Sequence, residues 1–407
     1  MPSQLRLPIA LSRTRASLLA LALGGFGIGT GEFVIIGLLP NVARDLHVTI
    51  PQAGYLISAY ALGVVVGAPL LAPVAAAMPR RRFVIAAIVT LAAGNFLSAA
   101  MPGFGALLVV RFLSGIPHGG YFGVSSVIAA GMVRNDRRSA AMSIVFAGLT
   151  FANVAGVPFA TFVGQHTSWR IVFAFVGAIE LVAALLVFLV VSGAPAGADA
   201  DEREQEPQLR RELQTFRQPQ IWLSLGIAMV GGGAMFCTFS YIAPMMTHLA
   251  GFSDSAITPL LVLFGVGMTL GNLIGARLAD RSLMRTIYVA LSLEAVVAVI
   301  FYFVAGSKVA SLVMIVLFPG CALALLPALQ SRIVSLAGGA PNLAAASIHA
   351  AFNLANSIGA WLGGAVIAAG LGYAAPNLAA AGLAIAGLGV AVASGRFELR
   401  HGPVMTP

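Results

Sequence analysis

Residues 107–120 read Leu-Leu-Val-Val-Arg-Phe-Leu-Ser-Gly-Ile-Pro-His-Gly-Gly and lie inside an apolar run from Phe104 to Val133. Arg111 is the only charged residue of this run. A guanidinium stays charged at any ordinary pH, and placing one near the middle of a bilayer costs at least about 2.5 kcal/mol on insertion scales. Arg111 therefore needs a partner or water inside the membrane.

The composition is that of an integral membrane protein. Of the 407 residues, 59% are hydrophobic and 9% are charged, whereas a soluble domain carries about 25% charged residues. Runs of 18 or more mostly apolar residues predict membrane-spanning helices, so we expect an all-α membrane protein surrounded by the lipid bilayer. The net charge of +9 comes from short connections between the apolar runs, so we expect no nucleic-acid partner.

The distribution of basic residues predicts the topology. If the N-terminus faces the cytoplasm, all but four of the 23 Lys and Arg residues fall in cytoplasmic segments; Arg44, Arg170 and Lys308 lie outside and Arg111 lies within a span. So strong a bias places both termini in the cytoplasm and requires an even number of spans. We predict twelve, at residues 17–39, 53–77, 83–101, 105–132, 139–163, 170–192, 221–246, 256–279, 286–305, 309–335, 343–370 and 375–395.

The spans form two related halves. The one hydrophilic stretch divides the chain into a bundle at 1–192, a cytoplasmic linker at 193–219 and a bundle at 220–407. A shift of 204 residues aligns the halves without a gap at four pairs of residues, which are Pro40 and Pro244, Gly63 and Gly267, Gly67 and Gly271, and Arg81 and Arg285. This repeat predicts two pseudo-symmetric six-helix bundles, an architecture of secondary transporters whose substrate site lies between the halves.

Glu32 is the only acid of the first apolar run, Ala16 to Leu39. It lies roughly 10 Å from the outer end of its span, and Arg111 lies roughly 9 Å from the same face of the membrane, at 1.5 Å per residue. We therefore expect Glu32 and Arg111 to meet in a hydrated cavity. Two interpretations stay open: coupling to protons, which requires the pair to separate in one conformation, and a permanent structural salt bridge.

Other polar residues inside the spans are candidates for substrate binding. His118 lies two helical turns after Arg111 and faces nearly the same way, so it is a candidate for substrate contact or proton relay as well as for packing. Buried amides must find partners, either the substrate or a neighbouring helix. The substrate-binding candidates are His118, Asn153, Tyr60, Tyr241, His349, Asn353 and Asn356.

The sequence contains no nucleotide-binding glycine loop with Lys-Ser/Thr, no metal-ligand cluster and no catalytic-triad spacing. We therefore expect no enzymatic activity, no cofactor and no metal. The energy source should then be an ion gradient.

Several motifs resemble the major facilitator superfamily, and within it the twelve-span drug:proton antiporters of the arabinose-efflux and chloramphenicol-resistance permease type. Residues 30–33, Thr-Gly-Glu-Phe, and 37–45, Gly-Leu-Leu-Pro-Asn-Val-Ala-Arg-Asp, are similar to the entry signature of that group. Residues 111–115, Arg-Phe-Leu-Ser-Gly, match a fourth-span motif whose arginine the family uses in proton coupling. Residues 148–158 occupy the place of the antiporter motif but carry Ala152-Asn153 where Gly-Pro is usual.

The resemblance also implies gating residues. The cytoplasmic loop motif is present in the second half as Gly275 to Arg281, with Asp280 and Arg281 at its end, but the first half has Ala76 and Ala77 at the equivalent positions. Gating by charge should then rely on Arg81, Asp280 and Arg281. By the same resemblance, the intramembrane acids Glu180 and Glu294 lie in peripheral helices, where we expect a structural role.

We therefore expect a monomeric, multi-pass protein of the bacterial inner membrane that exports a small molecule in exchange for protons by alternating access. A drug such as chloramphenicol or a sugar would suit the amides and histidines, and antibiotic resistance by efflux is implied. One alternative is a proton symporter or facilitated carrier that takes up a small polar solute. Another is a membrane receptor or assembly factor without transport.

Overall fold

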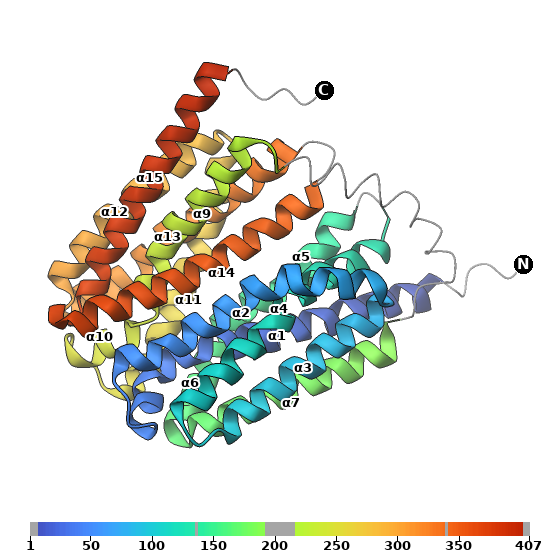
Figure 1. The fold of residues 1–407 in the computed structure, drawn as a ribbon, viewed down its shortest axis with the longest axis horizontal. Coiled ribbons are helices and arrows are strands. Elements are labelled where there is room, and N and C mark those ends of the chain that lie inside the picture. The colour runs from blue at the N-terminus through green and yellow to red at the C-terminus, as the bar shows by residue number, and fades with distance from the viewer. Residues whose placement is uncertain (1–6, 135–136, 192–215, 338–340, 402–407) are drawn as a thin grey trace, which may run out of the picture. The chain divides into compact units, whose positions relative to one another are not determined.

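The computed structural model describes residues 7–134, 137–191, 216–337 and 341–401, and over these ranges the chain is helical without a strand (Figure 1). Eleven helical segments of this described part are long and apolar enough to cross a membrane. The helix Phe104–Gly131 is not among them although it has 28 residues, because Arg111, Ser114, Pro117 and His118 lower its hydropathy. The prediction of a multi-pass helical membrane protein is confirmed.

The helices coincide with the predicted spans, with ends that differ by a few residues in most cases. The first half contains α1 (Leu7–Asp45), α2 (Ile50–Ala77), α3 (Arg80–Ala100), α4 (Phe104–Gly131), α5 (Arg138–Phe151), the π-helical segment η2 (Ala152–Gly156), α6 (Val157–His166) and α7 (Trp169–Val190). The second half contains α9 (Pro219–Phe239), α10 (Ile242–His248), η4 (Asp254–Ala256), α11 (Ile257–Ala279), α12 (Leu283–Val304), α13 (Lys308–Ala337), α14 (Pro341–Val366), η5 (Ile367–Leu371) and α15 (Ala375–His401).

Two spans are not single regular helices. The fifth span runs as α5, η2 and α6, so its π-helical turn falls on the residues where the antiporter-like motif departs from its usual form. The seventh span breaks after Phe239 and resumes at Ile242, because Ser240 and Tyr241 leave the regular helix. The predicted linker at 193–219 lies almost wholly outside the described residues.

The described chain groups into two compact units. The first unit comprises the described residues of Met1–Leu38 and Leu62–Ala198, and the second comprises Leu39–Ala61 with the described residues of Asp199–Pro407. The unit boundaries therefore fall inside α1 and α2, whereas the division predicted from the linker places Leu39–Ala61 with the first half. Within the second unit, Ser58 and Ser357 exchange hydrogen bonds, since each hydroxyl donates to the other residue's carbonyl at 3.0 Å.

Equivalent helix–helix contacts occur in both units, at residue numbers that differ by 204. Gly63 and Gly67 of α2 lie so close to α4 that a Cβ at either position would overlap the carbonyl oxygens of Phe112 and Ile116. In the second unit, Gly267 and Gly271 of α11 lie in the same way against Val316 and Gly320 of α13. Adding 204 to each number of the first set gives the second, so both members of each contact are related by the repeat.

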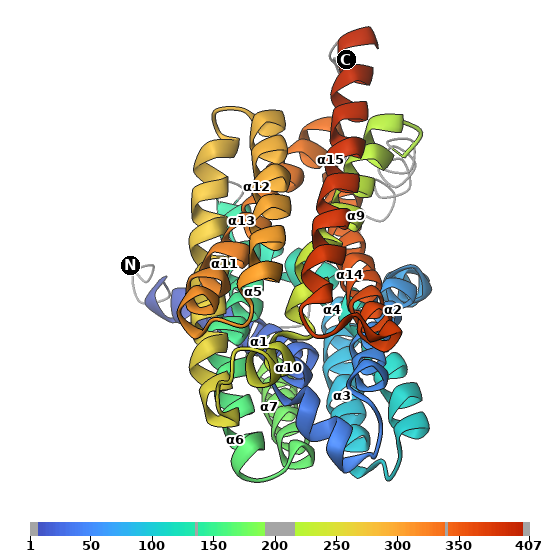
Figure 2. The same ribbon diagram turned by 90° about the vertical axis from the view of Figure 1, so that its left-hand side faces the viewer.

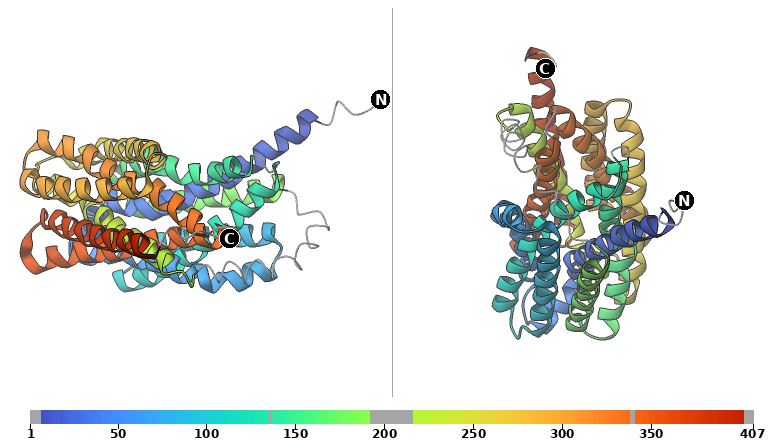
Figure 3. Two further views of the ribbon diagram at one scale, coloured as in Figure 1. Left: turned by 90° about the horizontal axis from the view of Figure 1, so that it is seen from above. Right: turned by 90° about the vertical axis from the view of Figure 1, so that its right-hand side faces the viewer.

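The first and last helices of the described chain, α1 and α15, are long. α1 has 39 residues, about 58 Å at 1.5 Å per residue, against about 30 Å for the hydrocarbon core, and Figure 3 shows its blue end extending past its neighbours in the first unit. In the second unit α15 packs along α9 and α12, and its red end extends beyond them (Figure 2). α1 is therefore longer than the hydrocarbon layer is thick.

Candidate functional site

Glu32 is buried in the first unit, with 4% of its surface exposed. One of its carboxylate oxygens, Oε2, lies 3.8 Å from Nδ1 of His118. These two residues come from α1 and α4, and neither points toward lipid. A carboxyl and an imidazole at this separation form an ion pair whenever the histidine is protonated and the glutamate is not.

Arg111 lies on the same face of α4 as His118, two turns earlier, and its side chain is completely buried. Its guanidinium carbon lies 5.2 Å from the centre of the Phe173 ring of α7, a cation–π arrangement that stabilises a desolvated cation. The interior position expected for Arg111 and Glu32 is therefore what the structure shows, while their direct pairing stays a prediction.

A fourth ionisable residue, Glu180, belongs to the same bundle. Glu180 of α7 is completely buried, and its Oε2 accepts a hydrogen bond of 2.8 Å from Nδ2 of Asn95 on α3. Glu180 is also close enough to Arg111 for an electrostatic interaction. Its side chain thus points into the bundle interior, and the structural role expected from the family resemblance stays a prediction.

The glycines of α1 make room for this pair. A Cβ at Gly27 would lie 2.8 Å from Cγ of Glu180, and one at Gly31 would lie 3.3 Å from the amide atoms of Asn95. Gly27 and Gly31 are one turn apart, so one strip of α1 backbone lies directly over the Glu180–Asn95 hydrogen bond. These glycines therefore allow α1 to pack closely on polar side chains of α3 and α7.

Asn153 lies in the π-helical turn of the fifth span and is half-buried. Its Nδ2 donates to the carbonyl of Leu149 at 3.2 Å, so the side-chain amide forms a hydrogen bond within its own span. The irregular turn also packs against α1, because a Cβ at Gly156 would overlap the side chain of Thr30. Asn153 therefore stabilises the turn, and a contact with substrate stays a prediction.

Among the candidates in the second unit, Asn353 and Asn356 of α14 are buried and His349 is half-buried. Nδ2 of Asn353 donates to the carbonyl of His349 at 3.0 Å, but its Oδ1 accepts no hydrogen bond from the described residues. A buried amide oxygen without a donor costs about 1–3 kcal/mol. Asn353 thus has an acceptor oxygen available for a hydroxyl or amide N–H group of a solute.

The two tyrosines are buried. Tyr241 donates its hydroxyl to the carbonyl of Ala360 at 2.8 Å, and Gly54 and Gly364 lie so close that a Cβ on either would overlap this hydroxyl. The hydroxyl proton of Tyr241 is therefore used in a hydrogen bond inside the protein. Tyr60 is buried in the same unit, and a role for it in substrate binding stays a prediction.

The three gating candidates have different surroundings. Arg81 donates to the carbonyl of Phe188 and lies 4.9 Å from the centre of its ring, so it connects α3 to α7 within one unit. Asp280 and Arg281 are exposed, and no side-chain hydrogen bond or ion pair joins either of them to another described residue. Their gating role stays a prediction.

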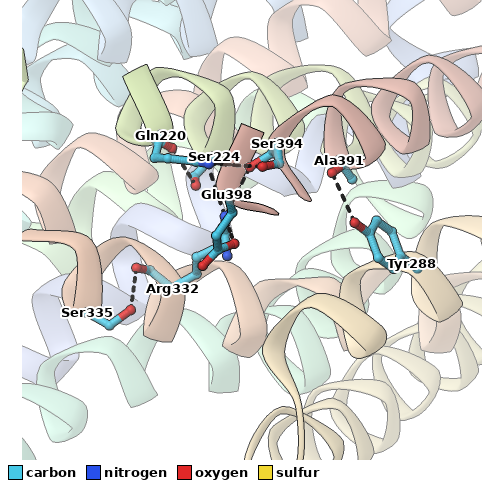
Figure 4. A network of polar contacts seen from close by, with 8 residues as sticks. All are labelled: Gln220, Ser224, Tyr288, Arg332, Ser335, Ala391, Ser394 and Glu398. Carbon is cyan, nitrogen blue, oxygen red and sulfur yellow. Dashed lines mark hydrogen bonds and ion pairs between the residues drawn. The ribbon is translucent and has the colours of Figure 1, made fainter. Parts of the chain in front are cut away.

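Two further charged residues, Glu294 and Arg332, are buried in the second unit. Glu294 of α12 is 1% exposed, and neither of its oxygens accepts a hydrogen bond from the described residues. Arg332 of α13 donates through Nη2 to Gln220, Ser394 and Glu398, with the carboxylate of Glu398 at 3.1 Å (Figure 4). This network joins α13 to α9 and α15.

Reasoning from sequence missed Asn95 and Arg332. Asn95 is an amide inside an apolar span, which is the signal that selected Asn153, Asn353 and Asn356. Arg332 lies near the end of its span and therefore counts as a cytoplasmic residue in the topology. Within the described residues, no group of three or more His, Cys, Asp or Glu side chains could hold a metal ion.

Ionisable residues buried inside bundles of membrane-spanning helices define a class of protein, the multi-pass membrane transporters, because a charge in that place marks the path of a solute or an ion. The chain belongs to the Major Facilitator Superfamily, whose family model matches residues 21–364. The resemblance seen in the sequence is thereby confirmed, and the protein is a transporter of small solutes and not an enzyme.

Known proteins agree with this assignment. The chain is 39% identical over 356 residues to the inner membrane transport protein YdhP of Escherichia coli (strain K12), covering 88% of this chain and 90% of the relative. It is 35% identical over 358 residues to the chloramphenicol resistance protein of Streptomyces lividans, with coverages of 88% and 90%. A bacterial homologue of the human lysosomal transporter Spinster, in an inward-facing and unoccupied conformation, shares the fold with a TM-score of 0.75 at 18% identity, covering 95% of this chain and 98% of that one.

Proposed function

We propose that this protein is a proton-coupled exporter of the bacterial inner membrane, with both termini in the cytoplasm, that works as a monomer without a cofactor. Its substrate would be a small neutral or weakly polar compound, such as chloramphenicol or a sugar. The observation that carries the proposal is the buried pair of Glu32 and His118 in the unit that also buries Arg111. Two titratable groups in one helix bundle with a permanent cation provide a place where a proton is bound and released.

The proposed cycle uses alternating access. When Glu32 is ionised, it is held by the positive charges of α4; when it takes up a proton, that attraction weakens and the other facing state becomes favourable. Binding of substrate would favour the opposite state, so that the two ligands exchange. The chloramphenicol resistance protein of Streptomyces lividans supports a drug as the exported compound, and the acceptor oxygen of Asn353 suits a solute with hydroxyl or amide N–H groups.

Inverted membrane vesicles test the proposal directly. Respiration acidifies their lumen, and a pH-sensitive dye follows the gradient while chloramphenicol or a test sugar is added outside. An antiporter releases lumenal protons when its substrate is added, so the dye signal recovers in vesicles with the wild-type chain and recovers much less in vesicles with Glu32→Gln.

The compounds to be added come from growth of a pump-deficient host that expresses the protein, on a panel of antibiotics and sugars. A compound that the host tolerates better but that moves no protons would overturn the proton coupling. Accumulation of a solute by intact cells together with protons would replace export by uptake.

A further inference from the structure

Glu180 is a second carboxyl in the first unit, and the exchange described above does not use it. It lies on α7, whereas Glu32 lies on α1, yet both face the interior that contains Arg111 and His118. Glu180 has no lipid-exposed surface.

The donors around Glu180 are few. Oε2 accepts one hydrogen bond from Asn95, and Oε1 accepts none from the described residues. Arg111 interacts with Glu180 electrostatically, although no ion pair joins the two in the described residues, and its guanidinium carbon lies 5.2 Å from the centre of the Phe173 ring. An ionised carboxylate in the interior needs close cations or several donors to offset a desolvation penalty of several kcal/mol. A single amide offsets little of that penalty, which favours the protonated form of Glu180 in this conformation.

The charges that face Glu180 can be counted helix by helix. α3 contributes the neutral Asn95, and α4 contributes Arg111 and the phenol of Tyr121, which donates to the carbonyl of Leu21. The first unit also buries Glu32 of α1 and His118 of α4. A proton on one of the two acids or on His118 brings the net charge of these buried groups to zero.

We propose that Glu180 is a second proton-carrying residue of this transporter, with Asn95 as the residue that positions its carboxyl. This inference rests on the proposed proton coupling and extends it from one carboxyl to two. Glu180 releases its proton when Arg111 turns toward it, and takes a proton up again when Arg111 returns to Phe173. Each cycle then exchanges one more proton than Glu32 alone accounts for.

The first test detects the carboxyl groups that titrate in purified protein without any substrate. Infrared difference spectra between mildly acid and mildly alkaline pH show the carbonyl stretch of each carboxyl group that titrates. Glu180→Gln keeps the volume and can still accept from Asn95, so the fold is retained and one titrating band should disappear. Asn95→Leu should shift that band in frequency. A Glu180→Gln spectrum identical to that of the wild type would overturn the proposal.

The second test measures stoichiometry in proteoliposomes, with chloramphenicol as the transported probe. The pH gradient that just balances a fixed probe gradient gives the number of protons exchanged per probe molecule. Glu180→Gln should lower this number by one, whereas Glu294→Gln, a buried acid of the second unit outside this group, should leave it unchanged. An unchanged number in Glu180→Gln would overturn the second carrier while leaving Glu32 in place. A wild-type protein that moves the probe without protons would instead refute the proposed function.

Discussion

At the scale of single residues, Tyr241 shows how closely the helices of the second unit approach one another. Its hydroxyl donates to the carbonyl of Ala360 and occupies the space above Gly364. In Gly364→Ala the new methyl overlaps this hydroxyl, so we expect a loss of about 1–3 kcal/mol in the free energy of unfolding. Removing the oxygen with Tyr241→Phe should restore most of that loss, because the ring carbon beneath it lies at an ordinary contact distance of 3.4 Å.

A double-mutant cycle of thermal stability in detergent measures this coupling. The two substitutions should be non-additive by at least about 0.5 kcal/mol, the coupling expected of residues in contact. Strict additivity would mean that the alanine methyl does not meet the tyrosine hydroxyl.

Glu294 and Glu180 offer a second comparison of single residues. Glu294 has no hydrogen-bond partner in the described part of the chain, whereas Glu180 accepts from Asn95. Replacing Glu294 by Leu removes a poorly solvated carboxyl, so stability should be unchanged or rise by about 1–3 kcal/mol. Glu180→Leu should lower it by about 1–3 kcal/mol, because the amide of Asn95 loses its acceptor. The two melting temperatures, measured side by side, check the contrast, and a loss in Glu294→Leu as large as that in Glu180→Leu would contradict it.

At this scale the sequence predicts how deep a residue lies in the membrane. It does not predict toward which neighbouring helix the side chain points. Spacing along α1 and α4 places Glu32, Arg111 and His118 inside a bundle, and the structure confirms their burial. The sequence gives no way to know that α7 turns Glu180 toward α3, since that depends on which helices are neighbours. The same limit hides the partners of Arg332, which are distant in sequence.

At the scale of helices, the small residues of α2 and α11 determine how closely pairs of helices pack. Gly63→Ala and Gly267→Ala each place a methyl against a backbone carbonyl of the adjacent helix, Phe112 or Val316, which cannot rotate away. Each should destabilise its unit by about 1–3 kcal/mol. Gly382 of α15 is exposed, with open space where a Cβ would lie, so Gly382→Ala should stabilise by roughly 0.5–1 kcal/mol through helix propensity.

Melting temperatures of these three alanine variants in one detergent compare the effects. Equal changes at all three positions would show that close packing at the repeated glycines does not limit stability.

The network of Arg332 joins three helices of the second unit at once. Glu398→Ala removes the carboxylate but leaves Gln220 and Ser394 as acceptors, and Glu398 is itself one-third exposed. We therefore expect a loss of about 1–2 kcal/mol, below the 3–5 kcal/mol of a fully buried broken pair. Combining Arg332→Met with Glu398→Leu should recover stability relative to Glu398→Ala, since no uncompensated charge then remains. A double variant less stable than the single one in thermal unfolding would contradict this.

Helix ends were predictable to within a few residues in most cases because the alternation of apolar runs with basic connections marks each boundary; α1 and α15 are the exceptions. Two irregularities within the helices could not be predicted from the sequence. The π-helical turn at Ala152–Gly156 and the break at Ser240 and Tyr241 depend on contacts with other helices, such as that of Gly156 with Thr30. Local propensity alone gives a continuous helix at both places.

At the scale of the whole molecule, the two halves repeat their backbone packing but not their charges. The repeated glycine contacts relate α2 and α4 to α11 and α13, yet the residue equivalent to Arg111 is Ile315, which is buried and apolar. Arg111, Glu32, His118 and Glu180 belong to the first unit, while the candidate amides of α14 belong to the second. The repeat thus supports a shared scaffold, and the proposed proton-binding residues all belong to one of its two units.

The measurement that tests the central claim compares two transport modes of Glu32→Gln in proteoliposomes, with chloramphenicol or the best compound from the growth panel. The substitution imitates a permanently protonated Glu32, so exchange of labelled for unlabelled substrate should continue while transport driven by a pH gradient should be strongly reduced. Undiminished gradient-driven transport in Glu32→Gln would contradict the account, because the buried carboxyl would then have no part in coupling.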